Sequence, residues 1–199
     1  MTELRALKAA LRKDIASKLK SLSEDDIKHY SSLVHKKLFA LKQYQQAQRV
    51  SVYLSTSTEI DTSKIIEDLI NKGKTVFVPR FERGHNLMQM LSLHSLSDYR
   101  NLPEIMWGIR QPQTAEGRED VMETGHLDLV IAPGVAFTVK GLRLGHGRGY
   151  YDRFLTNYQT KFHKSPYVVA LALPQQILDS VPTGETDVTL NNVLVADQN

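Results

Sequence analysis

The 199-residue sequence contains no cysteine. This absence excludes disulfide bonds, thiolate metal sites and a cysteine nucleophile. Long apolar runs are also missing, because no segment approaches the roughly 18 residues that a membrane-spanning helix needs, and no signal-peptide pattern opens the chain. We therefore expect no membrane contact and a cytoplasmic protein, with a mitochondrial location left as the alternative.

The composition that remains is that of an ordinary globular domain, with 41% hydrophobic and 24% charged residues. The length suits one domain over residues 1–199. Its net charge of +3 is uneven, because residues 1–42 carry ten basic and five acidic side chains, a balance of +5 against −2 for the rest. Such a basic face suits an anionic ligand, although solvated helix surfaces often look the same. No nucleic-acid-binding signature accompanies it, so we expect no nucleic acid partner.

The basic segment predicts a pair of helices packed on the domain. Leucine and isoleucine recur at spacings of three and four from Leu4 to Leu22, which predicts one apolar stripe facing inward on a helix. Ser23 is a candidate N-cap for a second helix, which ends near Leu41, and Asp26 follows at the capping-box position.

The rest of the chain alternates short apolar runs with helical patterns, which predicts an α/β fold with a largely parallel sheet flanked by helices. We expect strands at 49–55, 75–81, 127–133 and 167–173, with further short ones at 87–95 and 193–196. Helices are expected at 61–73 and 151–158. Residues 96–125 show little periodicity and contain two prolines and two internal glycines, so we expect long surface loops there.

The segment RLGHGRGYYDRFL (143–155) places three glycines among basic residues just before a predicted helix. In open α/β sheets, ligands bind beyond the carboxyl ends of strands, often at a helix N-terminus. Glycine N–H groups can turn toward an anion, and Arg143, His146 and Arg148 supply charge. The spacing matches neither a Walker A loop nor a dinucleotide-binding loop. It favours phosphate binding, with an ordinary glycine-rich turn as the alternative.

A longer stretch, IAPGVAFTVKGLRLGHGRGYYDRFL (131–155), closely resembles the signature of the 5-formyltetrahydrofolate cyclo-ligase (methenyltetrahydrofolate synthetase) family. The likeness covers nearly the whole chain, because other pieces follow in the family's order: the pair Lys8 and Arg12, YLSTSTEIDT, GKTVFVPR, MWGIRQP and VPTGETDVTLNNVL. The resemblance implies a three-layer fold of the NagB/RpiA/CoA-transferase-like kind. It also implies ATP- and Mg²⁺-dependent conversion of 5-formyltetrahydrofolate (folinate) to 5,10-methenyltetrahydrofolate, with release of ADP and phosphate, through an imidate phosphate on the formyl group.

The same resemblance implies where ATP and magnesium bind. Lys8 and Arg12 lie one helical turn apart and can both reach the nucleotide phosphates, although solvated helices often share that spacing. Arg148, with Arg143, is the implied catalytic residue, because a planar guanidinium suits phosphoryl oxygens. The full implied ATP site is Lys8, Arg12, Arg143, Leu144, Gly145, His146, Gly147, Arg148, Gly149, Tyr150 and Tyr151. Asp152 and Asp187 are the implied magnesium ligands, with a helix N-terminal charge and a turn residue as their structural alternatives.

The implied folate site overlaps the glycine segment. Glu59 suits the amino and N–H donors of the pterin, with an exposed acid in a loop as the alternative. Tyr150 and Trp107 offer flat faces to the pterin ring, although a core role for the tryptophan stays open. Arg80, at a strand end, is a further candidate to bind a phosphate or the glutamate tail of the folate, and Lys74 is a weaker one. The substrate-binding residues implied are Leu54, Glu59, Trp107, His146, Gly147, Arg148, Gly149 and Tyr150.

Two positions depart from the family's pattern. Thr138 occupies a place where aspartate is common, and Thr186 one where histidine is frequent. These departures bear on the metal site rather than on the reaction. A non-catalytic folate- or nucleotide-binding protein, or a phosphosugar isomerase-like enzyme of the same fold, stays open as an alternative. We expect a monomer.

Overall fold

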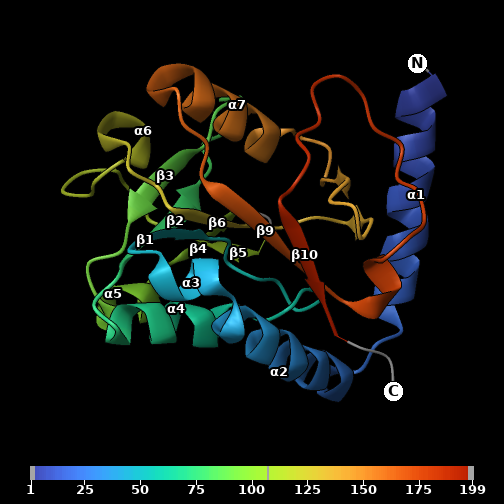
Figure 1. Ribbon diagram of the computed structural model, residues 1–199, viewed down its shortest axis with the longest axis horizontal. Helices are drawn as coiled ribbons and strands as arrows, with labels where there is room; N and C mark the ends of the chain where they lie inside the picture. The colour runs from blue at the N-terminus through green and yellow to red at the C-terminus, as the bar shows by residue number, and fades with distance from the viewer. Residues whose placement is uncertain (1–2, 107, 197–199) are drawn as a thin grey trace.

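Six strands form one mixed sheet at the centre of the computed structural model, which describes residues 3–106 and 108–196 (Figure 1). Across the sheet the strands follow the order β10 (Asn192–Val195), β9 (Tyr167–Ala172), β6 (Leu129–Ala132), β1 (Arg49–Val52), β2 (Thr75–Arg80) and β3 (Gln89–Ser92). All neighbours are parallel except β2 and β3. The expected largely parallel sheet is therefore confirmed, and the run expected at 87–95 forms its antiparallel edge.

Continuous apolar runs become the strands that are buried on both faces. Every residue of β6 is buried, and five of the six residues of β9 are buried beside it, with Leu129 opposite Tyr167 in the parallel register. Such strands need a layer of helices on each side. A small separate hairpin, β7 (Ala136–Phe137) and β8 (Arg143–Leu144), follows β6 and was not foreseen, because two-residue strands leave no periodic signal.

Helices cover both faces of the sheet, so the structure has three layers (Figure 1). On one side lie α2 (Glu24–Ala40), α3 (Lys42–Gln46), α4 (Ser63–Asn71) and α5 (Leu96–Arg100), and on the other α6 (Val121–Thr124) and α7 (Tyr150–Phe162). Ser23 caps α2 as expected, because its Oγ accepts the N–H of Asp26 and its own N–H donates to that carboxylate. Within the described ranges, no helix is long and apolar enough to cross a membrane.

The first helix, α1 (Glu3–Lys20), stands at one end of the molecule beside the segment that joins β9 to β10 (Figure 1). It packs near the short 3₁₀ helix η1 (Pro174–Gln176). The expectation of one inward apolar stripe was wrong for its first half, because Leu4 and Leu7 are 36% and 54% exposed. Only Ile15 and Leu19 are buried in the core. Two polar side chains of the first half, Lys8 and Arg12, are half-buried instead.

The expectation of unbroken loops between residues 96 and 125 was also wrong in part. This stretch contains α5, α6 and a hairpin of β4 (Glu104–Met106) and β5 (Ile109–Arg110). Single side chains start both helices, since Ser95 Oγ accepts the N–H of Asp98 and Asp120 Oδ1 accepts the N–H of Met122. Elements of two to five residues are too short for periodicity to reveal, so only these caps could have indicated them.

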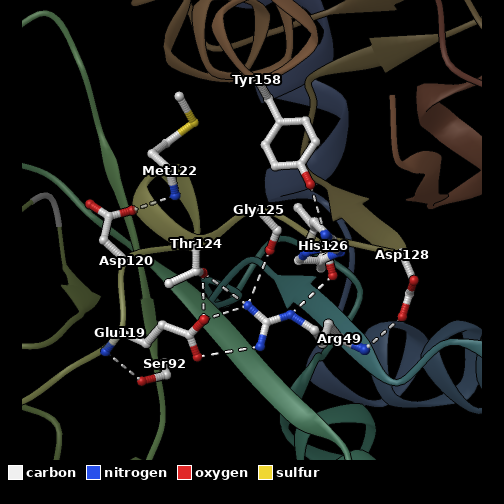
Figure 2. A network of polar contacts seen from close by, with 11 residues as sticks. Arg49, Ser92, Glu119, Asp120, Met122, Thr124, Gly125, His126, Asp128 and Tyr158 are labelled. Carbon is white, nitrogen blue, oxygen red and sulfur yellow. Dashed lines mark hydrogen bonds and ion pairs between the residues drawn. The ribbon is translucent and has the colours of Figure 1, made fainter. Parts of the chain in front are cut away.

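A polar network fastens the end of the sheet at which β1 begins (Figure 2). The Arg49 guanidinium donates to both carboxylate oxygens of Glu119, at 2.5 and 3.3 Å, and also to Thr124 and to the carbonyls of Gly125 and His126. The Tyr158 hydroxyl of α7 accepts the N–H of Leu127 at 2.8 Å. These contacts hold the chain that enters β6 against β1 and α7, so the opposite end of the sheet is presented on a fixed frame.

Candidate functional site

A cavity of about 430 Å³ lies where three neighbouring parallel strands end. Leu54 follows β1, Phe81 follows β2 and Pro133 follows β6, and all three line it. The glycine segment, residues 143–149, closes the other side together with the start of α7. The cavity therefore occupies the carboxyl edge of the sheet, where the α/β pattern of the sequence predicts a ligand.

The walls of this cavity are mainly aromatic and aliphatic. Tyr53, Leu54, Phe81, Ile109 and Tyr150 are among the residues that line it. The rings of Phe81 and Tyr150 pack with centroids 5.0 Å apart. Flat apolar walls with a few polar groups suit a flat heterocyclic ligand.

Glu59 is held in place on one wall. Its Oε2 accepts the N–H and the hydroxyl of Thr56, at 2.8 and 2.9 Å, and its side chain is 12% exposed. Its Oε1 lies 3.9 Å from Nε2 of His146, which belongs to the glycine segment. Burial, and then the charge of Glu59, raise the pKa of the Tyr53 hydroxyl well above its ordinary value, so Tyr53 stays protonated and donates to the Ile60 carbonyl. Glu59 is thus an oriented carboxylate in an apolar wall.

Arg143 is the buried cation of the site, with 3% of its side chain exposed. It donates to Asp152 Oδ1 at 2.7 Å and to the carbonyl of Pro133 at 3.1 Å. Asp152 Oδ1 also accepts the N–H of Val188 at 3.1 Å. The pair therefore links the end of β6, the first turn of α7 and the segment that leads to β10.

The first helix reaches the glycine segment with its two inward cations. Lys8 forms an ion pair with Asp187, and Arg12 donates to the carbonyl of Gly145 at 2.8 Å. Partial burial raises the pKa of Asp187, but hydrogen bonds from Lys8 and from the Gly184 N–H and the charges of Lys8 and Arg143 outweigh it and leave that pKa below its ordinary value. Lys8, Arg12, Arg143 and Asp187 thus form one electrostatic cluster behind the glycines.

Two of the glycines have a conformation that other residues rarely adopt. Gly147 and Gly149 have φ angles of +105° and +66°, in the left-handed region. A Cβ on Gly147 would also lie 3.4 Å from Cζ of Arg12. The positive φ angles therefore explain the glycines at these two positions, and the segment leads directly into the N-terminus of α7.

Two buried polar atoms beside the cavity have no partner among the described residues: the hydroxyl of Tyr151 and Nε of Arg143. Burial, offset in part by the charge of Arg143, raises the pKa of the Tyr151 hydroxyl above its ordinary value, so it is a proton donor. Buried polar groups are nearly always hydrogen-bonded in proteins. These unpaired donors therefore indicate that a polar ligand group belongs in the cavity.

Most of the residues implied by the resemblance come together here. The cavity is lined by Leu54, Glu59, Arg143, Gly145, His146, Arg148, Gly149, Tyr150, Tyr151 and Asp152. Gly147 contacts Arg12, and Leu144 is buried in β8. Trp107 lies outside the described residues. Sequence reasoning missed Tyr53, Phe81 and Ile109, although the first two could have been found from their places at strand ends.

Two weaker candidates do not belong to the cavity. Lys74 lies at the opposite end of β2 and donates to the carbonyls of Tyr44 and Gln45, so its expected place near the site was wrong. Arg80 lies at the carboxyl end of β2, the end nearest the cavity, but its Nη1 donates to Gln89 at 2.6 Å and it does not line the cavity.

Thr138, which departs from the family's pattern, has a structural role. Its Oγ1 accepts the N–H of Leu142 at 3.1 Å and closes the turn between β7 and β8, and it is 2% exposed. An aspartate can accept the same hydrogen bond. The other departure, Thr186, is an exposed residue next to Asp187. The first departure therefore exchanges one turn-forming acceptor for another outside the cavity.

No group of three or more His, Cys, Asp or Glu side chains that could hold a metal occurs in the described part of the chain. The two expected ligands nevertheless approach each other, because Asp152 accepts the N–H of Val188, the neighbour of Asp187. The bonds described above use Oδ1 of Asp152 and Oδ2 of Asp187. One further oxygen on each carboxylate fits magnesium, which favours few carboxylates together with substrate phosphates.

Comparison with known proteins gives a consistent result. The family model for the 5-formyltetrahydrofolate cyclo-ligase family matches residues 5–196. A probable 5-formyltetrahydrofolate cyclo-ligase of Caenorhabditis elegans is 40% identical over 98% of this chain and 95% of its own length. The mouse 5-formyltetrahydrofolate cyclo-ligase is 37% identical over 96% and 94%. Among solved structures, the Aquifex aeolicus 5,10-methenyltetrahydrofolate synthetase superposes with a TM-score of 0.76 at 27% identity, covering 94% of this chain and 89% of that one.

Proposed function

The chain belongs to the 5-formyltetrahydrofolate cyclo-ligase family, and we propose that it converts 5-formyltetrahydrofolate and ATP to 5,10-methenyltetrahydrofolate, ADP and phosphate. The membership, and the enzyme class in the family's name, confirm the resemblance seen in the sequence. One observation supports this activity most: an apolar cavity with an oriented carboxylate opens directly onto a cationic, glycine-rich helix N-terminus.

The folate end of the reaction fits the apolar cavity. A pterin between Phe81, Ile109 and Tyr150 presents its N–H donors to Glu59, whose carboxylate the Thr56 bonds already orient. The free Tyr151 hydroxyl gains a partner in a pterin or formyl oxygen. Each of these contacts replaces water by a fixed protein group, which favours one orientation of the ring.

The ATP end fits the glycine segment. The N–H groups at the start of α7 and the positive end of its dipole suit an anionic ligand. Lys8, Arg12, Arg143 and Arg148 supply cationic charge from two sides of that segment. We assign the γ-phosphoryl group to this region, next to the cavity that holds the formyl group.

The reaction then needs positioning more than covalent chemistry. The formyl oxygen attacks the γ-phosphorus, the bond to the β-phosphate oxygen breaks, and ADP leaves. N10 of the folate attacks the formyl carbon of the resulting imidate phosphate, loses its proton and expels phosphate, which closes the ring. Arg148 meets the charge that develops on the transferred phosphoryl group, and Arg143 holds the end of α7 in register.

The donor set of Asp152 and Asp187 suits Mg²⁺ bound together with ATP. When bound there, the ion neutralises charge on the triphosphate. In the structure, Lys8 pairs with Asp187 and Arg143 with Asp152. We propose that Lys8, the more exposed of the two cations, turns toward the phosphates when the nucleotide enters, while Arg143 stays paired with Asp152.

One spectroscopic assay tests the proposal. The purified protein, 5-formyltetrahydrofolate, ATP and Mg²⁺ are mixed, and the near-ultraviolet absorbance of the methenyl product is followed. We expect product only when both ATP and a divalent metal are present, with one ATP consumed per folate. Full activity with EDTA and without ATP would refute the ATP-dependent reaction. Tight folate binding without turnover would instead favour a non-catalytic binding protein. A monomer in the cytoplasm stays a prediction.

A further inference from the structure

A second cavity, of about 270 Å³, adjoins the first. Its walls are the loop between β2 and β3, from Glu82 to Asn86, the tip of β4, and the start of α7. Arg148 and Tyr150 line both cavities. The two cavities therefore meet at Arg148 and Tyr150.

The second cavity differs from the first in charge. Three arginines line it: Arg83, Arg148 and Arg153. The one acid in its lining, among the described residues, is Glu82, whose Oε2 lies 3.5 Å from Nη1 of Arg80. Lys8 and Arg12, which we assign to the nucleotide, line neither cavity. A cavity with this excess of guanidinium groups suits carboxylates, which accept paired hydrogen bonds from arginine.

The second cavity is held together by hydrogen bonds rather than by chance proximity. Arg153 donates from Nε to the carbonyl of Asn86 at 2.8 Å and from Nη2 to the carbonyl of Arg148 at 2.7 Å. Its guanidinium lies 5.5 Å from the ring centroid of Tyr150. The Tyr150 hydroxyl donates to the carbonyl of His85 at 3.0 Å. The loop and α7 are thereby joined, and Arg153 keeps further N–H groups of its guanidinium for a ligand.

We propose that this second cavity binds the glutamate carboxylates of the folate substrate, with Arg83 and Arg153 as their partners. The inference rests on the proposed function. A folate carries a flat pterin at one end and a glutamate with two carboxylates at the other. The apolar cavity suits the pterin, and the adjoining arginine-rich cavity suits the glutamate.

Kinetics with and without the glutamate test this assignment. We expect the wild-type protein to show a KM for 5-formyltetrahydrofolate about tenfold lower than for 5-formyltetrahydropteroate, which lacks the glutamate, because each partly exposed ionic contact contributes about threefold. The double variant Arg83→Gln/Arg153→Gln should lose this preference. Its KM for the glutamate-free compound and its KM for ATP should change less than its KM for 5-formyltetrahydrofolate. Arg5→Gln, an exposed arginine on α1, is the matched control and should alter neither constant.

The single variant Arg83→Gln guards against misfolding, because Arg83 is exposed and its loss should leave the fold intact. It should remove about a threefold part of the preference. Equal turnover of both compounds by the wild type, or an equal loss for both in the variants, would overturn the inference alone. A raised KM for ATP with an unchanged KM for folate would assign the arginines to the nucleotide and overturn it too. No turnover of either compound would overturn the proposed function and this inference with it.

Discussion

Arg148→Ala separates a catalytic from a structural interpretation of the glycine segment. The side chain is exposed, and the backbone carbonyl that accepts from Arg153 at 2.7 Å remains in the variant. Gly147 and Gly149, with their left-handed φ angles, set the path of the segment. The free energy of unfolding should therefore change by no more than about 0.5 kcal/mol, as for most surface substitutions.

The effect on the rate should be far larger. If Arg148 meets charge that develops on the γ-phosphoryl group, its loss removes a contact made mainly in the transition state. Removal of one preorganised donor of this kind typically lowers kcat by about 10²- to 10³-fold, or about 2.7–4 kcal/mol. The KM for folate should change little. Arg148→Lys should restore only part of the rate, because an ammonium group lacks the planar fork of a guanidinium.

Steady-state kinetics with both substrates, together with a thermal melt of each variant, provide the measurement. Arg5→Ala, on the exposed face of α1, controls for the loss of one positive charge from the protein. A kcat near the wild-type value in Arg148→Ala would refute the reasoning. It would also remove the main argument that this segment carries out phosphoryl transfer.

Further predictions concern the frame of the site. Arg49→Ala should lower the free energy of unfolding by about 1–3 kcal/mol in urea titrations, because Glu119 and its neighbours lose a charged donor, whereas Arg100→Ala, at an exposed pair, should cost less than about 0.5 kcal/mol. The hydrogen bond from Arg49 is the main reason why the pKa of Glu119 lies below its ordinary 4.5 in the folded protein. The stabilisation from this ion pair is therefore complete above pH 4.5 and is lost as the pH falls through the folded-state pKa of Glu119. The loss of unfolding free energy caused by Arg49→Ala should then be smaller at acidic pH. An equal loss at neutral and acidic pH would contradict this. Thr138→Asp should leave activity within a few-fold of wild type, or raise it, because aspartate can close the same turn; a collapse in rate in a folded variant would show another role. Asp187→Asn should raise the KM for ATP with Mg²⁺ more than the KM for folate, and the reverse pattern would remove Asp187 from the metal site.

Local sequence patterns were enough to predict the layers of the fold and the edge of the sheet at which the cavity lies. The strands β6 and β9 are continuous apolar runs, and the glycine segment stands directly before α7, so each signal and its structure occupy the same few residues. The carboxyl-edge rule predicted a ligand site at the end of the sheet where the cavity lies. The family resemblance suggested roles for individual residues, which hydrophobic periodicity cannot indicate.

Contacts between distant residues could not be predicted in the same way. Lys8 and Asp187 are 179 positions apart, and nothing near either residue indicates the other. Leu4 and Leu7 continue a helical stripe in the sequence, yet they are exposed because α1 extends along the glycine segment instead of the core. Arg153 had no separate signal, since its role depends on a loop that approaches α7 from β2.

The fate of the formyl oxygen tests the central claim most directly. The substrate is prepared with ¹⁸O in its N5-formyl group, turned over with ATP and Mg²⁺, and the released phosphate is analysed by mass spectrometry. If the γ-phosphoryl group is transferred to that oxygen, each phosphate carries one ¹⁸O atom. Unlabelled phosphate, with the label recovered in water or in folate, would contradict the account.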